Sequence, residues 1–116
     1  VSLWGLFEPG EAQVPEVQHA MLGRVAAAID QFPGRVEVLG HSDNKPIRSL
    51  RFPDNWVLSE RRAQAVQRLL VAILPADRVS FQGLGDSRPL VENDSPTNRA
   101  INRRVEIILY PDSPEL

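Results

Sequence analysis

The stretch from Val36 to Asn44, VEVLGHSDN, determines how the rest of the chain is interpreted. Two valines alternate with a glutamate, which is the pattern of a half-buried strand. Gly40 then removes the side chain where the backbone must turn or approach another element closely. Hydrogen-bonding side chains follow at once, from His41 to Asn44. Because ligands of open α/β sheets bind outside the carboxyl ends of strands, we expect a binding site here.

Composition favours one soluble domain and excludes several kinds of site. The chain has 116 residues, 42% of them hydrophobic, and a formal net charge of -2, which disfavours a nucleic-acid binder. It contains no cysteine, which excludes disulfides, thiolate zinc sites and cysteine nucleophiles. We expect a single domain over residues 1–110 and a flexible tail over 111–116. The sequence shows neither a membrane-spanning segment nor a signal peptide, and since it begins with Val we expect a fragment of a longer chain.

Hydrophobic periodicity predicts strands and helices in alternation. We expect strands over 1–7, 35–39, 79–82 and 103–110, and helices over 15–31 and 57–74. The buried stripe of the first helix is predicted to contain Val17, Met21, Val25, Ala28 and Ile29, and that of the second Leu58, Val66, Leu69, Leu70 and Ile73. Helices between successive strands favour parallel crossovers, so the prediction is an α/β sandwich with helices on the sheet; the last two strands are compatible with antiparallel pairing.

Arg62 stands out because it falls on the apolar stripe of the second predicted helix. It lies four residues after Leu58 and four before Val66. An arginine near a buried face needs a partner, and either a structural salt bridge or a bound ligand would provide one. Its helix follows the loop that begins at Asp43, so the carboxylate and the guanidinium could flank one pocket. Such a pair suits a zwitterion, with the ammonium on Asp43 and the carboxylate on Arg62.

Other polar clusters give weaker signals. His41 and Asp43 have the H-x-D spacing of some metal sites, but the chain has only 2 histidines and metal sites need three or four ligands. We therefore expect no metal, no cofactor and no catalytic role. Strand alternation places Arg103 on the face of Val105, beyond the core edge, and Arg104 on the opposite face in solvent.

Taken together, these pieces resemble the OmpA-like (OmpA/MotB C-terminal) peptidoglycan-binding family. The resemblance covers almost the whole chain, and it departs from the family at Ser42, where threonine is usual. The motifs that carry it are Gly40-His41-Ser42-Asp43-Asn44; Leu58-Ser59, Arg62-Ala63 and Val66; Gly83, Gly85 and Pro89; and Asn93, Arg99 and Asn102-Arg103-Arg104-Val105-Glu106.

The resemblance implies a βαβαββ mixed sheet with helices packed on one face. It also implies a non-catalytic periplasmic module that binds the peptide stem of peptidoglycan through diaminopimelate, with Asp43 and Arg62 as the binding pair. Further wall residues carried over from the family are Asn44, Leu58, Asn93, Arg99 and Arg104. The parent protein would be anchored in the inner membrane and would contact other subunits of an envelope complex, with a homodimer also allowed.

The loop over 44–56 is similar to two branches of this family. One is the C-terminal domain of the type VI secretion inner-membrane protein DotU/TssL, which its Pro-Ile-Arg run favours, and the other is the flagellar stator protein MotB. Two other hypotheses remain open on sequence alone. The domain could be an interaction or dimerisation module in which Arg62 pairs internally with Asp43, or a metal-dependent hydrolase that uses His41 and Asp43.

Overall fold

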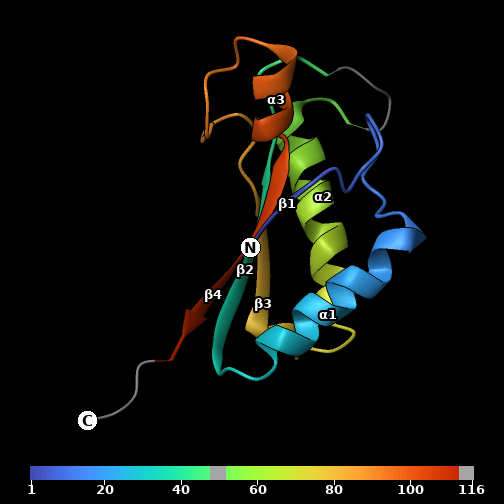
Figure 1. The fold of residues 1–116 in the computed structure, drawn as a ribbon, viewed down its shortest axis with the longest axis vertical. Coiled ribbons are helices and arrows are strands. Elements are labelled where there is room, and N and C mark those ends of the chain that lie inside the picture. The colour runs from blue at the N-terminus through green and yellow to red at the C-terminus, as the bar shows by residue number, and fades with distance from the viewer. Residues whose placement is uncertain (48–51, 113–116) are drawn as a thin grey trace.

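A four-stranded sheet forms the centre of the computed structural model, which describes residues 1–47 and 52–112 (Figure 1). The helical elements alternate with strands along the chain. In order, the elements are β1 (Ser2–Trp4), a 3-10 turn (Glu16–Gln18), α1 (His19–Ile29), β2 (Gly34–His41), α2 (Asn55–Leu70), a second 3-10 turn (Ala76–Arg78), β3 (Val79–Gly83), α3 (Pro96–Asn102) and β4 (Arg104–Pro111).

The sheet is mixed, as predicted, and its strand order is β1-β4-β2-β3. β2 and β3 are parallel, whereas β4 runs antiparallel to both of its neighbours, β1 and β2. The last strand of the chain is therefore inserted between the first two, and it does not pair with β3. This insertion brings the start of β4 beside the end of β2, because Arg104 pairs with His41.

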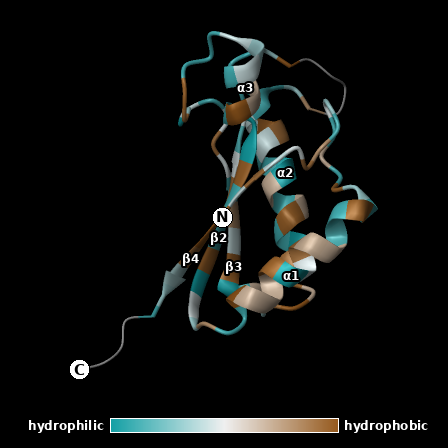
Figure 2. Cartoon of the chain, in the orientation of Figure 1, coloured by the Kyte–Doolittle hydropathy of each residue, from teal (hydrophilic) through white to brown (hydrophobic). Residues whose placement is uncertain are grey.

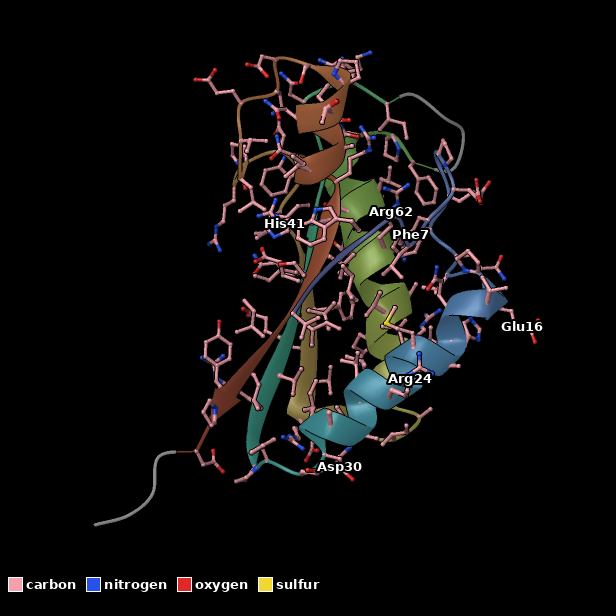
Figure 3. The ribbon with its side chains drawn as sticks, in the orientation of Figure 1. Phe7, Glu16, Arg24, Asp30, His41 and Arg62 are labelled. Carbon is pink, nitrogen blue, oxygen red and sulfur yellow. The ribbon has the colours of Figure 1, made fainter. Side chains whose placement is uncertain are left out.

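Helices α1 and α2 pack on one face of the sheet and close the core, which confirms the predicted layering (Figure 1). Apolar residues are concentrated where these layers meet (Figure 2). Charged residues such as Glu16, Arg24 and Asp30 lie on the opposite, solvent side of the first helical segment (Figure 3). The buried core includes Leu22, Ala26, Val36, Val38, Ala63, Val66, Leu70, Leu74, Val79, Val105 and Ile107.

Helix α2 approaches the sheet most closely at a glycine. A Cβ added at Gly40 would lie 2.1 Å from the backbone oxygen of Ser59, so only glycine fits beneath this turn of the helix. The predicted need for a close backbone approach at Gly40 is thus confirmed, although the neighbour is a helix of the same domain.

The phase of the first helix differs from the prediction. Leu22, Ala26 and Ile29 are buried, whereas Val17 is 85% exposed and Ala28 is exposed. The chain before His19 forms a 3-10 turn, which has three residues per turn, so the buried face of α1 cannot be extrapolated back through Val17.

The second helix begins at Asn55, two residues before the predicted start, and the side chain of its N-cap residue Asp54 accepts a hydrogen bond of 2.9 Å from the backbone nitrogen of Val57. It ends at Leu70 rather than at Leu74, and a turn follows in which Leu74 is buried and Ile73 is 45% exposed.

A short helix, α3, occupies part of the segment that we expected to be a loop. Ser95 caps it by accepting a hydrogen bond from the backbone nitrogen of Asn98 at 3.1 Å, and a proline occupies its first turn. Gly83, Gly85 and Pro89 precede it, and this run of turn residues concealed the signal.

The C-terminal strand extends slightly beyond the predicted domain. β4 continues through Pro111, one residue beyond the predicted domain end, and the rest of the predicted tail, 113–116, lies outside the described residues, as do positions 48–51 of the loop before α2. In the part of the chain that the structure describes, no helix combines the length and apolar character needed to cross a bilayer.

The face of the sheet opposite the helices carries a buried polar cluster. The His41 side chain is 1% exposed and its Nε2 faces Oε1 of Glu106, which also accepts a hydrogen bond of 3.2 Å from Arg104. The prediction that Arg104 is solvated is wrong: it is 5% exposed and also donates to the backbone oxygen of Arg88 at 3.1 Å. The chain before α3 crosses this face and covers it, which strand alternation alone does not reveal.

The close packing at Gly40 gives a stability prediction. We expect Gly40→Ala to lower the free energy of unfolding by about 1–3 kcal/mol, because the new methyl group meets backbone and the helix must move. Gly23→Ala, on α1, is the matched control, since its Cβ would meet nothing within 4 Å and should be neutral or stabilising by roughly 0.5–1 kcal/mol. Urea unfolding of both variants measures the difference, and an equal stability for the two would contradict the packing argument.

The buried imidazole predicts a pH dependence of stability. Burial lowers the pKa of His41, the charges of Arg104 and Arg88 lower it further, and Glu106 opposes them. Among the described residues Nδ1 of His41 has no hydrogen-bond partner, so protonation would bury an unpaired donor. The unfolded chain takes up this proton near its ordinary pKa of about 6.5, before the folded chain does. Stability should therefore fall as pH falls from about 7.5 to 5.5, and His41→Gln should flatten that slope; parallel slopes for the two proteins would refute this assignment.

Candidate functional site

A cavity of about 540 Å³ opens where the chain leaves β2. Its wall is formed by the segment after β1, the first turns of α2 and the start of β4, which meet at this end of the sheet. Apolar side chains and several charged groups share the lining, among them Leu6, Phe7, Ser42, Asp43, Lys45, Leu58, Arg62, Ala100, Arg103 and Arg104.

Asp43 lies in this cavity and is only 7% exposed. Its Oδ1 accepts a hydrogen bond of 3.0 Å from the backbone nitrogen of Lys45, and its Oδ2 accepts one of 2.6 Å from Nη1 of Arg103. The backbone around it is fixed by a hydrogen bond of 2.8 Å from the nitrogen of Ser42 to the oxygen of Gly85. The carboxylate is thus oriented by the backbone of Lys45 and by the guanidinium of Arg103, and the backbone before it is anchored to Gly85.

Arg62 enters the same cavity from α2. Its Nε donates to the backbone oxygen of Glu11 at 2.7 Å, its Nη2 donates to that of Glu8 at 3.3 Å, and its guanidinium lies 5.0 Å from the ring centroid of Phe7 (Figure 3). Burial lowers the pKa of Arg62, as does the charge of Arg103, while Asp43 and Glu11 oppose the shift. An arginine remains charged in proteins, so Arg62 is a partly buried cation.

Arg103 is the residue that the sequence prediction placed at the core edge without a partner. It is the C-cap residue of α3, with φ −79 and ψ 90, and its side chain reaches Asp43 while remaining 46% exposed. The alternation of β4 did place Arg103 and Arg104 on opposite faces. Recognising the short helix before them would have shown that Arg103 turns toward the end of β2.

The other predicted wall residues are divided between the cavity and its surroundings. Leu58 and Arg104 line the cavity, although the described hydrogen bonds of Arg104 run to the opposite face. Asn44 is exposed and Arg99 lies on α3, and neither belongs to the lining. Asn93 accepts a hydrogen bond of 2.9 Å from Asn102 and also lies outside the lining.

Asn102 has a supporting role that the sequence analysis did not assign. It is fully buried, and its Oδ1 accepts hydrogen bonds from the backbone nitrogens of Leu90 and Val91 at 2.8 and 3.1 Å. Its Nδ2 donates to the oxygen of Val91 at 2.8 Å. Because Asn102 directly precedes Arg103, it ties the loop over 84–95 to the position from which Arg103 enters the cavity.

A metal site is not assembled at this end of the sheet. His41 faces Glu106 rather than Asp43, and the described residues contain no group of three or more potential metal ligands. The arrangement in the cavity instead offers a carboxylate, two guanidinium groups and an apolar wall, which can bind charged organic groups.

Solved structures with the same fold come from bacterial envelope proteins. The cell wall anchor of the type VI secretion system (T6SS) from Pseudomonas aeruginosa has a TM-score of 0.90 and 42% sequence identity, and the match covers 96% of this chain and 80% of that chain. The periplasmic domain of Helicobacter pylori MotB has a TM-score of 0.87 and 29% identity over 97% of this chain and 75% of that one.

Curated relatives match over most of this chain but only part of their own length. YtxE of Bacillus subtilis is 34% identical over 106 residues, which are 90% of this chain and 44% of that protein. The peptidoglycan-binding protein ArfA of Mycobacterium tuberculosis is 35% identical over 102 residues, 86% of this chain and 30% of that protein. The model of the OmpA family matches residues 6–103, and the chain therefore belongs to the OmpA family.

Proposed function

We propose that this chain is a non-catalytic periplasmic module that binds the peptide stem of peptidoglycan through its diaminopimelate residue. The observation that carries the proposal is that Asp43 and Arg62 line one cavity beside the end of β2. The end of the diaminopimelate side chain bears an ammonium and a carboxylate on one carbon. Asp43 would accept the ammonium and Arg62 would donate to the carboxylate.

The cavity suits such a ligand in size and in lining. Its volume of about 540 Å³ lies within the range of small-molecule sites, and Phe7 and Leu58 provide apolar surface for the methylene chain. Asp43 is nearly buried and Arg62 partly buried, so water screens ionic contacts there less than at an open surface. Membership of the OmpA family, the peptidoglycan binding of ArfA and the cell-wall anchoring by the secretion-system protein support peptidoglycan as the ligand.

The parent protein is proposed to anchor an envelope complex to the cell wall. The similarity to the anchor of a type VI secretion system favours that complex over a flagellar stator, in agreement with the loop sequence. The domain would then lie in the periplasm, joined to an inner-membrane segment and in contact with other subunits of the complex. We retain residues 1–110 as a single binding domain within this proposal.

The alternative of a ligand-free interaction module receives less support. That hypothesis predicts a direct Asp43–Arg62 pair and a closed pocket. Within the described part of the chain, the carboxylate of Asp43 pairs with Arg103, and the cavity between Asp43 and Arg62 is open.

The proposal predicts that isolated cell-wall sacculi will sediment this domain. Arg62→Ala should weaken binding by roughly 1.5–3 kcal/mol, because it removes one charge-assisted contact to the ligand carboxylate. Asp43→Asn should weaken it similarly by removing the partner of the ammonium. Co-sedimentation titrations at two salt concentrations measure both effects.

Arg61→Ala is the matched control, because it removes the same charge from the neighbouring position of α2 at a residue that does not line the cavity. Since Arg62 also holds the segment over 8–11, urea unfolding must show that each variant remains folded. Wild-type protein that stays in the supernatant, or loss of binding that is equal for Arg61→Ala and Arg62→Ala, would overturn the proposal.

A further inference from the structure

The charges around the cavity are unequal. Among the described residues that line it, Asp43 is the acidic side chain, while Lys45, Arg62, Arg103 and Arg104 are basic. Arg104 is already compensated by Glu106 on the other face of the sheet. The remaining cations outnumber the single carboxylate, so a ligand with no net charge would leave positive charge without a partner in the cavity.

Arg103 and a ligand ammonium would compete for the same carboxylate. Nη1 of Arg103 lies 2.6 Å from Oδ2 of Asp43, while Oδ1 already accepts from the backbone of Lys45. A carboxylate oxygen accepts more than one hydrogen bond, but a ligand ammonium bound at Asp43 would share its single negative charge with the guanidinium and weaken the contact of Arg103. The side chain of Arg103 is 46% exposed, against 11% for that of Asp43, so the arginine can move without leaving a buried gap.

The two guanidinium groups also repel one another. The charge of Arg103 is the second cause, after burial, that lowers the pKa of Arg62. Release of Arg103 from Asp43 would leave its charge without that carboxylate, beside the charge of Arg62, which Asp43 and Glu11 only partly offset. An anionic group placed between or beside them would relieve that repulsion.

We propose that Arg103 is a specificity residue that exchanges Asp43 for a second carboxylate of the ligand when the ligand's ammonium binds Asp43. The inference rests on the proposed function, and it narrows the ligand class to a peptide with one ammonium and two carboxylates near each other. The ammonium binds Asp43, the first carboxylate binds Arg62, and the second binds the released Arg103. Every charge that the exchange disturbs then regains a partner.

A peptidoglycan stem offers two sources of the second carboxylate. One is the α-carboxylate of the isoglutamate residue that precedes diaminopimelate, which is lost where that residue is amidated to isoglutamine. The other is the free C-terminal carboxylate of a stem that ends at diaminopimelate. Both provide the same chemistry, so the experiment must separate them.

Calorimetric titration with synthetic stem peptides tests the inference. The first peptide is a tetrapeptide with isoglutamate, the second is its isoglutamine form, and the third is an isoglutamine tripeptide that ends at diaminopimelate. We expect wild-type protein to bind the first about three- to tenfold more tightly than the second, the range for a charge-assisted contact at a half-exposed side chain. Recovery of affinity with the third peptide would assign Arg103 to the C-terminal carboxylate, and no recovery would assign it to isoglutamate.

Arg103→Gln should abolish the difference in affinity between the peptides. The variant should lose the preference for the acidic peptide, and it should bind the isoglutamine tetrapeptide at least as tightly as wild type, because no cation must leave Asp43. Arg61→Gln is the matched control: it changes the net charge equally but lies outside the cavity lining, and it should keep the wild-type ratio.

The outcomes distinguish this inference from the proposed function. If wild type binds all three peptides equally, or if Arg103→Gln keeps the wild-type ratios among them, the role of Arg103 is wrong while peptidoglycan binding stands. If wild type binds none of the three peptides, both are overturned. A ratio that Arg61→Gln reduces as much as Arg103→Gln does would reveal a general charge effect and also refute the specific role.

Discussion

The close contact between α2 and the end of β2 is the constraint on which the site depends. At Gly40 the backbone of the strand lies directly beneath Ser59 of the helix, with no room for a side chain. This contact fixes the height of the helix above the sheet just before the chain turns into Asp43. Arg62, one turn beyond Ser59, is thereby placed over the same end of the sheet. A helix held farther away would separate the guanidinium from the carboxylate and widen the cavity between them.

The segment after β1 fixes the orientation of the Arg62 side chain above this end of the sheet. Arg62 donates to two of its backbone oxygens and lies over the ring of Phe7, so the segment and the helix hold each other. Backbone oxygens carry no formal charge, and they orient the guanidinium without neutralising it. The side chain is therefore both fixed in place and still available to an anion. That combination matches a preorganised binding group, for which little ordering is needed when the ligand arrives.

Much of this arrangement was predictable from the sequence. Local patterns predict the strand before Asp43 and the position of Arg62 on an apolar stripe, and the family resemblance agrees with both. The exposure of Val17 could not be predicted, because Val17 lies in a 3-10 turn that breaks the helical period before α1. The contact of Arg103 with Asp43 could not be predicted either, since Arg103 is the C-cap residue of α3, a helix that the sequence pattern did not reveal.

The adjacent residues Arg103 and Arg104 lie on opposite faces of the sheet and differ in burial and in ion-pair partner, which indicates different roles. Arg104 is buried beside Glu106 and His41 on one face, where its charge is compensated by the same strand and shielded by the crossing chain. Its removal would leave buried polar groups unpaired, as expected of a structural residue. Arg103 turns to the other face, where, among the described residues, Asp43 compensates its charge from across the cavity, and about half of its side chain is in water.

A pair of that second kind contributes little to stability, because solvent screens it and the long side chain loses freedom when it is held. Its position therefore needs an explanation other than stability. The carboxylate that it occupies is nearly buried and is already oriented by the backbone of Lys45, so Asp43 does not need Arg103 to remain in place. A cation whose side chain is half exposed, and that lies at the proposed contact point of the ligand, is well suited to exchange its partner when a ligand binds.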